Sequence, residues 1–327
     1  MKLTLDQIKA SMSGCWNAEE ENGAIRFHRM PPPLSSFYRQ QPASRVRLEC
    51  TTCVRLRFIS NTATLRLGLQ FGQAARPFYQ GGLLIDGREH AIFGPGRAAP
   101  AWEGRILDRQ DCKESQFDLW MPHLVRTDLV VLEIDDQATF QPAPPLRRRW
   151  LACGDSITQG MTVPLPTQAV AARCALNLNL DVLNYGIGGA IMSKALSEAE
   201  INYPYDVLTV AYGANDLARN PLDQYAANLL GFLTRQVAAH PKAAFILITP
   251  IPLVGNEGPN DKGISLGDYR RAVQAVSQEL GFCRVVEGPV LVPNDARFFV
   301  DNVHPNIAGM ATYADHLAAY LEPEKKC

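Results

Sequence analysis

The sequence predicts two domains of different classes, an antiparallel β-sandwich followed by an α/β domain with a parallel sheet. Over the first 140 residues, short segments alternate apolar and polar side chains and are separated by turn signals. From Trp150 onward, apolar segments of strand length alternate with amphipathic helical segments. Between the two regions, "QATFQPAPPLRRRW" holds Pro142, Pro144 and Pro145. We therefore expect a sandwich or jelly-roll-like domain over 1–140, a proline-rich linker over 141–148 and an α/β domain over 149–327.

Alternation with a period of two carries the sandwich prediction. In "SRVRLECTTCVRLRFISNTATLRLGLQF", one face of half-buried antiparallel strands is expected to hold Val46, Leu48, Val54, Leu56, Phe58, Leu65, Leu67, Leu69 and Phe71. Asp86-Gly87 within "LLIDGREHAIF" predicts a hairpin turn. "FDLWMPHLVRTDLVVLEID" predicts two further strands, interrupted near Pro122. Many short strands with turns between them are typical of a sandwich or jelly roll.

Nearly continuous apolar segments predict the parallel sheet of the second domain. The expected strands are 150–153, 181–185, 206–212, 244–249 and 283–287. Helices are expected in "TQAVAARCALNL", "DQYAANLLGFLTRQVAAH" and "GDYRRAVQAVSQEL", and in a last helix that begins at Pro305, a residue that suits the first helical position. This alternation indicates a parallel sheet that is covered by helices on both faces.

Polar, glycine-containing clusters follow the expected strands. They are Gly154-Asp155-Ser156, "NYGIGGA", "YGANDLARN", "TPIPLVGNEGPNDKG" and, before the last helix, "DNVHP". In an open parallel sheet, the loops after the carboxyl ends of the strands share one edge, and ligands bind there. We therefore expect the five clusters to meet in one site.

These clusters contain the groups that serine-dependent acyl transfer requires. Ser156 is the expected nucleophile, His304 the base, and Asp301, three residues earlier, the group that orients the imidazole. Oxyanion donors are expected from the backbone N–H groups of Ser156 and Gly189 and from the side-chain amide of Asn215. Taken alone, each cluster also suits a helix cap or a tight turn, and it is their combination along one sheet edge that favours an enzyme.

Composition excludes other classes of protein. The 327 residues carry 32 basic and 33 acidic side chains, a net charge of −1, so we expect no nucleic-acid partner. The polar N-terminus and the absence of an 18-residue apolar run predict a soluble, cytoplasmic protein without membrane insertion. The eight cysteines are expected as free thiols, and Cys50 and Cys53 lack the further ligands of a zinc site. No metal or organic cofactor is expected, and homo-oligomerisation is left open.

Four sequence blocks in the second half resemble the SGNH, or GDSL-type, hydrolase family. They are Gly154-Asp155-Ser156, Gly189 within "NYGIGG", Gly213-x-Asn215-Asp216 and Asp301-x-x-His304, and the resemblance covers roughly 149–321. It implies a flavodoxin-like sheet and ester hydrolysis, with Ser156, His304 and Asp301 as the triad, Gly189 and Asn215 as oxyanion donors, and Gly154, Asp155 and Asp216 as supporting residues. The first half resembles the sandwich domains that precede SGNH domains in some bacterial carbohydrate acetyl esterases and acyltransferases.

The expected activity is hydrolysis of short-chain acyl esters, acetyl esters above all, of a sugar or small alcohol through an acyl-serine. The short acyl chain is favoured because the loop 250–268, which could wall the pocket or be a plain surface connection, is mostly polar. An acyltransferase would use the same triad with an acceptor alcohol. A phosphate or flavin binder would have no use for Asp301 and His304. The complete set of catalytic residue types argues against a non-catalytic binding module.

Overall fold

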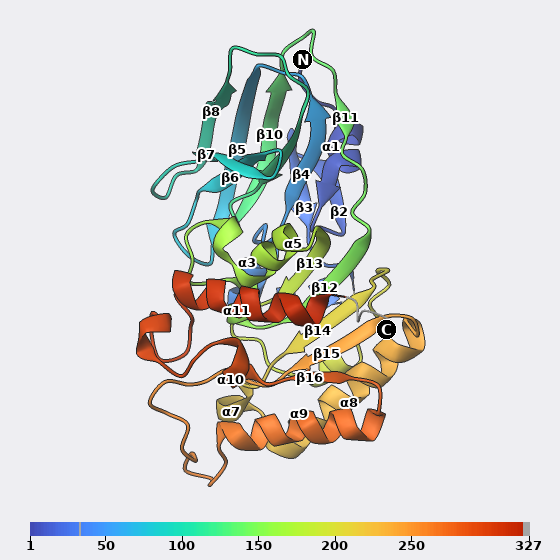
Figure 1. Ribbon diagram of the computed structural model, residues 1–327, viewed down its shortest axis with the longest axis vertical. Helices are drawn as coiled ribbons and strands as arrows, with labels where there is room; N and C mark the ends of the chain where they lie inside the picture. Colours follow the sequence, from blue (N-terminus) through green and yellow to red (C-terminus); the bar gives the residue numbers. More distant parts are fainter. Residues whose placement is uncertain (33, 323–327) are drawn as a thin grey trace. The chain divides into compact units, whose positions relative to one another are not determined.

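The computed structural model describes residues 1–32 and 34–322, and the last residues of the predicted second domain, 323–327, lie outside this part (Figure 1). The chain divides into two compact units. Unit 1 consists of Met1–Met30, Arg45–Leu146 and Pro164–Thr167, and unit 2 consists of Pro31–Ser44, Arg147–Val163 and Gln168–Cys327. Each unit thus includes one short segment that lies, in the sequence, within the other unit: 164–167 for unit 1 and 31–44 for unit 2. The predicted linker 141–148 contains a short strand at Gln141–Pro142 and the first residue of the strand that opens the parallel sheet.

Unit 1 contains two antiparallel sheets, as a β-sandwich requires. The first has the order β1 (Met12–Ser13), β4 (Arg55–Ser60), β9 (Ser115–Trp120), β6 (Gly81–Ile85), β7 (Arg88–Phe93), with β11 (Gln141–Pro142) beside β4. The second has the order β2 (Asn17–Glu21), β3 (Ala24–His28), β10 (Val125–Ile134), β5 (Thr64–Ala74), β8 (Ala101–Asp108). Helix α1 is Leu5–Ser11. Fully buried apolar side chains of both sheets form one core, in which Phe58 and Phe117 stack with their ring centroids 5.1 Å apart.

The hairpin and the two strands around Pro122 are confirmed. Asp86 and Gly87 have φ angles of 50° and 76°, the left-handed pair of a type I′ turn, and join β6 to β7. The strand expected at Val46 and Leu48 is wrong, because Pro42–Glu49 forms helix α3. Proline is favoured in the first turn of a helix, and the arginines that follow it are good helix formers, so the alternation of arginine with apolar residues there is not a strand signal.

Unit 2 is built on a five-stranded parallel sheet, and all five predicted strands are present. The order is β13 (Leu180–Gly186), β12 (Arg148–Gly154), β14 (Val207–Ala211), β15 (Ala244–Ile248), β16 (Arg284–Val286). This 2-1-3-4-5 order is that of a flavodoxin-like sheet. Because the chain leaves β12 for one neighbour, β13, and then returns to its other side at β14, the carboxyl end of β12 is the switch point of the sheet, where a crevice for ligands opens.

Helices cover both faces of this sheet. In Figure 1, α5 (Val170–Asn177) and α11 (Ile307–Leu321) lie on one face, and α8 (Leu222–Ala239) and α9 (Leu266–Leu280) on the other. The shorter helices are α2 (Leu34–Arg39), α4 (Ser156–Gln159), α6 (Lys194–Ser197), α7 (Asp216–Arg219) and α10 (Gly288–Leu291), with 3-10 turns at Pro166–Gln168 and Ala296–Phe298. The expected start of the last helix at Pro305 is wrong by two residues. Asn306 is its N-cap, because its side chain accepts a hydrogen bond from the Gly309 N–H at 3.0 Å.

Within the described residues, no helix is both long and apolar enough to cross a lipid bilayer. The seven cysteines in this part of the chain are free thiols, and Cys327 lies outside it. No cluster of three or more His, Cys, Asp or Glu side chains in the same part could hold a metal ion.

Candidate active site

Ser156 lies at the carboxyl end of β12, at the switch point of the parallel sheet. Asp155 is the N-cap of α4 and accepts a hydrogen bond from the Ile157 N–H at 2.9 Å, so the serine is the first residue of the helix and does not cap it. The Ser156 hydroxyl is therefore free for another partner. Its Oγ lies 2.9 Å from Nε2 of His304, although 148 residues separate the two in sequence.

Gly154 allows this turn to be tight. A Cβ at this position would overlap the Thr158 hydroxyl and lie 2.9 Å from the Ala211 carbonyl oxygen. No other residue fits so close to the neighbouring strand and to the first turn of α4. The sharp strand-to-helix turn at Ser156 therefore requires glycine at 154.

The loop before α11 holds His304 and Asp301 together. Asp301 Oδ1 accepts hydrogen bonds from the backbone N–H groups of Val303 and His304 at 2.8 and 2.7 Å, and Oδ2 lies 2.9 Å from Nδ1 of the His304 ring. The ring thus has its Nδ1 edge on the carboxylate and its Nε2 edge on Ser156. An aspartate in this position favours the neutral tautomer with hydrogen on Nδ1, which leaves the Nε2 lone pair to accept the proton of the serine.

Hydrogen bonding also keeps Asp301 ionised. Partial burial of this carboxylate opposes ionisation, but the hydrogen bonds from the His304 ring and from two backbone N–H groups outweigh it and lower the pKa of Asp301 below its ordinary value. The carboxylate remains charged at neutral pH and can stabilise a positively charged imidazole.

Two of the three expected oxyanion donors have no competing acceptor. Among the described residues, the backbone N–H groups of Ser156 and Gly189 donate no hydrogen bond. Gly189 has a φ of +77°, a conformation that favours glycine. The preceding N–H, of Gly188, is held at 2.8 Å by the side-chain oxygen of Gln159 in α4, which fixes the Gly189 turn to the nucleophile helix.

The third expected donor, Asn215, is held in place by its own hydrogen bonds. Its Nδ2 lies 3.2 Å from Oδ2 of Asp155 and 3.2 Å from the carbonyl oxygen of Ala190. These contacts connect the loop after β14 to the nucleophile turn and to the Gly189 turn. Both distances are at the long end of the range for N–H···O hydrogen bonds.

Asp155 and Asp216 are buried carboxylates that organise the site. Burial raises the pKa of Asp155 to about 6, and it also raises the pKa of Asp216 above its ordinary value. Asp216 Oδ1 accepts hydrogen bonds from the Met192 N–H at 2.9 Å and from the Asn220 side chain at 2.8 Å. It therefore joins the loop after β13 to α7 and holds Asn215 at the end of that helix.

Several residues that position the site have no signature in the sequence. Gln159 is fully buried, and Asn184 accepts a hydrogen bond from the Gly186 N–H and donates one to the Thr158 carbonyl at 2.7 Å in both cases. Asn220 and Asn228 both donate to the Met192 carbonyl at 2.9 Å. Their common feature, a buried side-chain amide, is visible only once the fold is known.

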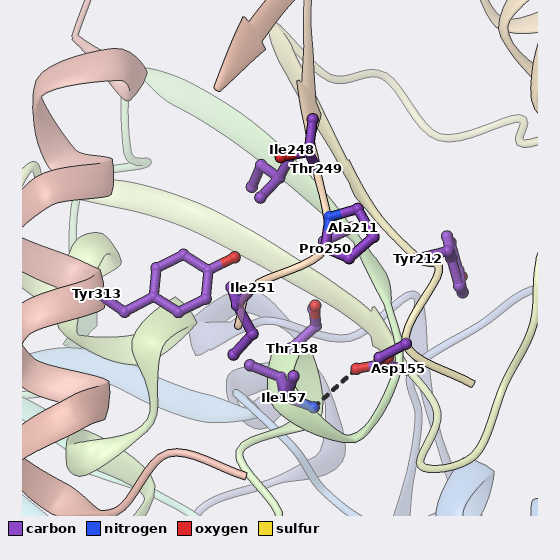
Figure 2. A pocket seen from close by; sticks show the side chains of 11 residues that line it. Asp155, Ile157, Thr158, Ala211, Tyr212, Ile248, Thr249, Pro250, Ile251 and Tyr313 are labelled. Carbon is purple, nitrogen blue, oxygen red and sulfur yellow. Dashed lines mark hydrogen bonds between the residues drawn. The ribbon is translucent and has the colours of Figure 1, made fainter. Parts of the chain in front are cut away.

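A small cavity lies beneath the nucleophile turn. It has a volume of about 20 Å³, and Figure 2 shows Asp155, Ile157 and Thr158 on one side and the Tyr313 hydroxyl extending toward it from α11. A space of this volume holds a single water molecule. The acyl group of a substrate therefore has no room beneath Ser156 and must bind on the open side of the loops.

The loop 250–268 is anchored to its surroundings. Arg270 in α9 forms two hydrogen bonds with the Glu257 carboxylate, both at 2.8 Å, and a third with the Pro250 carbonyl at 2.8 Å. The Val254 N–H donates to the Asn302 carbonyl, also at 2.8 Å, which connects this loop to the loop of the histidine.

Comparison with known proteins agrees with this arrangement. A family model described as the GDSL-like Lipase/Acylhydrolase family matches residues 152–312, which include every expected site residue. A search of curated proteins by sequence found no match.

Solved structures resemble the chain over most of its length. A salicylyl-acyltransferase from a tetracycline biosynthetic pathway has a TM-score of 0.82 and 19% identity, with 95% of this chain and 94% of that chain covered. A family two carbohydrate esterase from Clostridium thermocellum, in complex with cellohexaose, has a TM-score of 0.65 and 17% identity, covering 83% and 93%. An acetyl xylan esterase from the rumen bacterium Butyrivibrio proteoclasticus has a TM-score of 0.60 and 15% identity, covering 82% and 89%. At these identities the likeness is one of fold.

Proposed function

Because the chain belongs through residues 152–312 to the GDSL-like lipase/acylhydrolase family and is an ester hydrolase, we propose that it cleaves short acyl esters, acetyl esters above all, of a sugar or small alcohol. The observation that carries the proposal is the continuous chain of contacts from Ser156 through His304 to Asp301. All three lie in unit 2, which we propose as the catalytic domain.

The proposed reaction has two steps. Ser156 Oγ attacks the ester carbonyl while His304 Nε2 takes the hydroxyl proton, and the same proton then passes to the leaving alcohol as the acyl-serine forms. Water next attacks the acyl-serine, gives its proton to His304, and the proton returns to Ser156 as the acid leaves. In both steps the N–H groups of Ser156 and Gly189 and the amide of Asn215 bind the oxyanion.

One observation supports a short acyl group and a polar alcohol. The loop 250–268 exposes mainly polar side chains such as Asn256 and Lys262. A site for a long alkyl chain would instead be concave and predominantly apolar. The fold neighbours that act on acetylated xylan or bind cellohexaose are consistent with a carbohydrate ester.

Acyl transfer is the second candidate. The solved acyltransferase resembles this chain over 95% of its length, and the same triad serves both reactions. The two activities differ only in whether water or an acceptor alcohol attacks the acyl-serine. Measuring the product formed from an activated acetyl ester in the presence of a sugar separates them, because transfer yields a new ester and hydrolysis yields acetate.

The direct test compares the protein with Ser156→Ala on 4-nitrophenyl esters from acetate to palmitate. We expect hydrolysis that is fastest with acetate and falls by several powers of ten in the variant. Equal low rates from both proteins would overturn the assignment of the nucleophile. A preference for palmitate would leave the nucleophile in place and refute the short acyl group.

Asn215→Ala tests the oxyanion hole. Removal of one such donor typically lowers turnover about a hundredfold to a thousandfold. Asn177→Ala is the matched control, since Asn177 is an exposed asparagine at the end of α5 in the same unit. If Asn215→Ala stayed within a few-fold of the control, this amide would not be an oxyanion donor.

A further inference from the structure

Arg219 lies beside the expected oxyanion hole, although the triad chemistry does not use it. Its guanidinium donates to the carbonyl oxygen of Gly189 and, from Nε, to that of Asn215 at 3.5 Å. These are two of the residues that supply oxyanion donors. A Cβ built on Gly189 would meet no atom within 4 Å other than Arg219 Nη2, at 4.0 Å. The space over Gly189 is therefore open, and the guanidinium is the group at its border.

The same arginine lines a large hollow. This hollow has a volume of about 550 Å³ and lies within unit 2, between α7 with the residues after it and the loop that follows β15. Its polar lining includes Arg219, Asn256, Asn260, Asp261, Lys262 and Tyr269. A volume of this size is in the range of small-molecule sites. The small cavity beneath the nucleophile turn, at about 20 Å³, is not.

Several polar groups of the hollow are already engaged within the protein. The Tyr269 hydroxyl donates to the carbonyl oxygens of Asp216 and Asn220, and Asn260 Oδ1 accepts from the Lys262 and Ile264 N–H groups at 2.9 and 3.1 Å. These contacts give the walls a fixed shape. They leave the charged side chains as the groups that can recognise a ligand.

The charged groups of the hollow are two cations and one carboxylate. Among residues 1–32 and 34–322, no carboxylate lies within ion-pair distance of Arg219 or Lys262. Asp261, the one acidic residue of the lining, is therefore not paired with either side chain. The other basic side chain nearby, Arg270, is occupied by Glu257. Arg219 retains N–H donors beyond the two that bind carbonyl oxygens, and a guanidinium presents them in a planar fork that matches a carboxylate.

We propose that this hollow is a substrate subsite that binds a carboxylate carried by the ester, with Arg219 and Lys262 as its specificity-determining residues. The inference rests on the proposed esterase function and narrows its substrate class to acidic esters, such as an acetylated uronic acid or the ester of a dicarboxylic acid. Arg219 receives the carboxylate next to the oxyanion hole, while Lys262 adds a second positive charge from the opposite wall. The carboxylate takes no part in bond making or breaking.

The test uses pairs of esters that differ only in one negative charge. On the alcohol side, an acetylated methyl glucuronoside is compared with the acetylated methyl glucoside. On the acyl side, 4-nitrophenyl hydrogen adipate is compared with 4-nitrophenyl methyl adipate. The readout is the ratio of kcat/KM for the acidic and the neutral member. We expect a ratio of about ten or more in one of the two pairs, the lower end of what a hydrogen bond to a charged group contributes.

Variants then assign the preference to the two cations. Lys262→Gln and Arg219→Gln should each lower the ratio severalfold, mainly through KM, and Arg219→Lys should restore only part of it because the fork is lost. Lys242→Gln, at an exposed lysine after α8, is the matched control and should keep the ratio of the parent.

The outcomes separate the two hypotheses. Ser156-dependent hydrolysis with a ratio near one in both pairs, or a ratio that Arg219→Gln and Lys262→Gln leave unchanged, would overturn the subsite and keep the esterase. If neither the acidic nor the neutral esters are hydrolysed in a Ser156-dependent manner, the proposed function itself fails. The pair that shows the preference identifies whether the carboxylate belongs to the acyl group or to the alcohol.

Discussion

Replacing Asp155 by asparagine should remove a loss of stability that unit 2 suffers as the pH rises, and should make the protein less active. Asp155 is 3% exposed, and each of its oxygens accepts one hydrogen bond, from the Ile157 N–H and from the Asn215 amide. Neither donor carries a charge, so the carboxylate is buried without a hydrogen-bonded cation, and burial raises its pKa to about 6. Asparagine has the same shape and removes the charge.

The magnitude follows from the pKa. A carboxyl whose pKa rises from 3.8 to about 6 on folding binds its proton more tightly in the folded state. Its contribution to stability is therefore fully present below pH 3.8 and is lost as the pH rises through about 6. At about 1.4 kcal/mol per pKa unit, the total loss is about 3 kcal/mol, of which about 2 kcal/mol falls between about pH 4.5 and about pH 8.

The assay is urea-induced unfolding of both proteins at about pH 4.5 and about pH 8. Other titrating groups cancel in the difference between the two proteins, and so does any constant packing effect of the substitution. We expect the free energy of unfolding of Asp155→Asn, relative to the parent, to be about 2 kcal/mol more favourable at the higher pH. The same relative stability at both pH values would refute the argument that Asp155 is buried as a charge.

Turnover should change in the opposite direction. If the side-chain oxygen of the introduced asparagine keeps the hydrogen bond from the Ile157 N–H, its amide nitrogen faces the amide of Asn215, donor against donor. Asn215 then loses the acceptor that positions it, and we expect turnover to fall about a hundredfold, as for loss of an oxyanion donor. A variant that is fully active would show that Asp155 does not position Asn215.

Three further substitutions test the fold around the site and the sandwich. Gly154→Ala places a Cβ against Thr158 and the Ala211 carbonyl. Overpacking of this kind should lower the free energy of unfolding in urea by about 1–3 kcal/mol and reduce the burst of acyl-serine. Unchanged stability would show that the turn can relax. Trp150→Phe leaves the buried Thr209 hydroxyl without the indole N–H that lies 2.9 Å away, which should lower the free energy of unfolding by about 1–3 kcal/mol. If the lost hydrogen bond is the cause, adding Thr209→Val should restore part of this stability, as measured by calorimetry. Leu119→Ala in the core of unit 1 should cost about 2–5 kcal/mol in the unfolding of that unit, and a cost below about 1 kcal/mol would contradict the tight packing around this fully buried leucine.

The parallel sheet and the place of the site could be predicted because few alternatives compete with them. Continuous apolar strands that alternate with helices allow little besides a parallel sheet, and the loops at one end of such a sheet must meet. Ser156 and His304, 148 residues apart, come into contact for this reason. The same argument predicts the position of Gly189 and Asn215 but not the orientation of their donors.

Predictions failed where local patterns were ambiguous. The arginine-apolar alternation at Val46 and Leu48 fits one face of a strand, but the same residues favour a helix after Pro42. The sequence also does not predict the roles of Gln159 and Arg219, because a buried glutamine and a surface arginine have no sequence signature. Their partners, the N–H of Gly188 and the carbonyl of Gly189, become neighbours only through the fold.

Each unit contains a short segment from the other unit's part of the sequence, so the two units are not separable at a single position of the chain. Residues 31–44 belong to the unit with the parallel sheet, where α2 contacts α6 and buries Leu34 and Tyr38, and Pro164–Thr167 belongs to the other unit. A single cut in the gene near codon 147 would therefore deprive each half of residues that complete it. A catalytic fragment that begins near residue 147 would therefore need the α2 segment supplied in trans or fused to it through a linker.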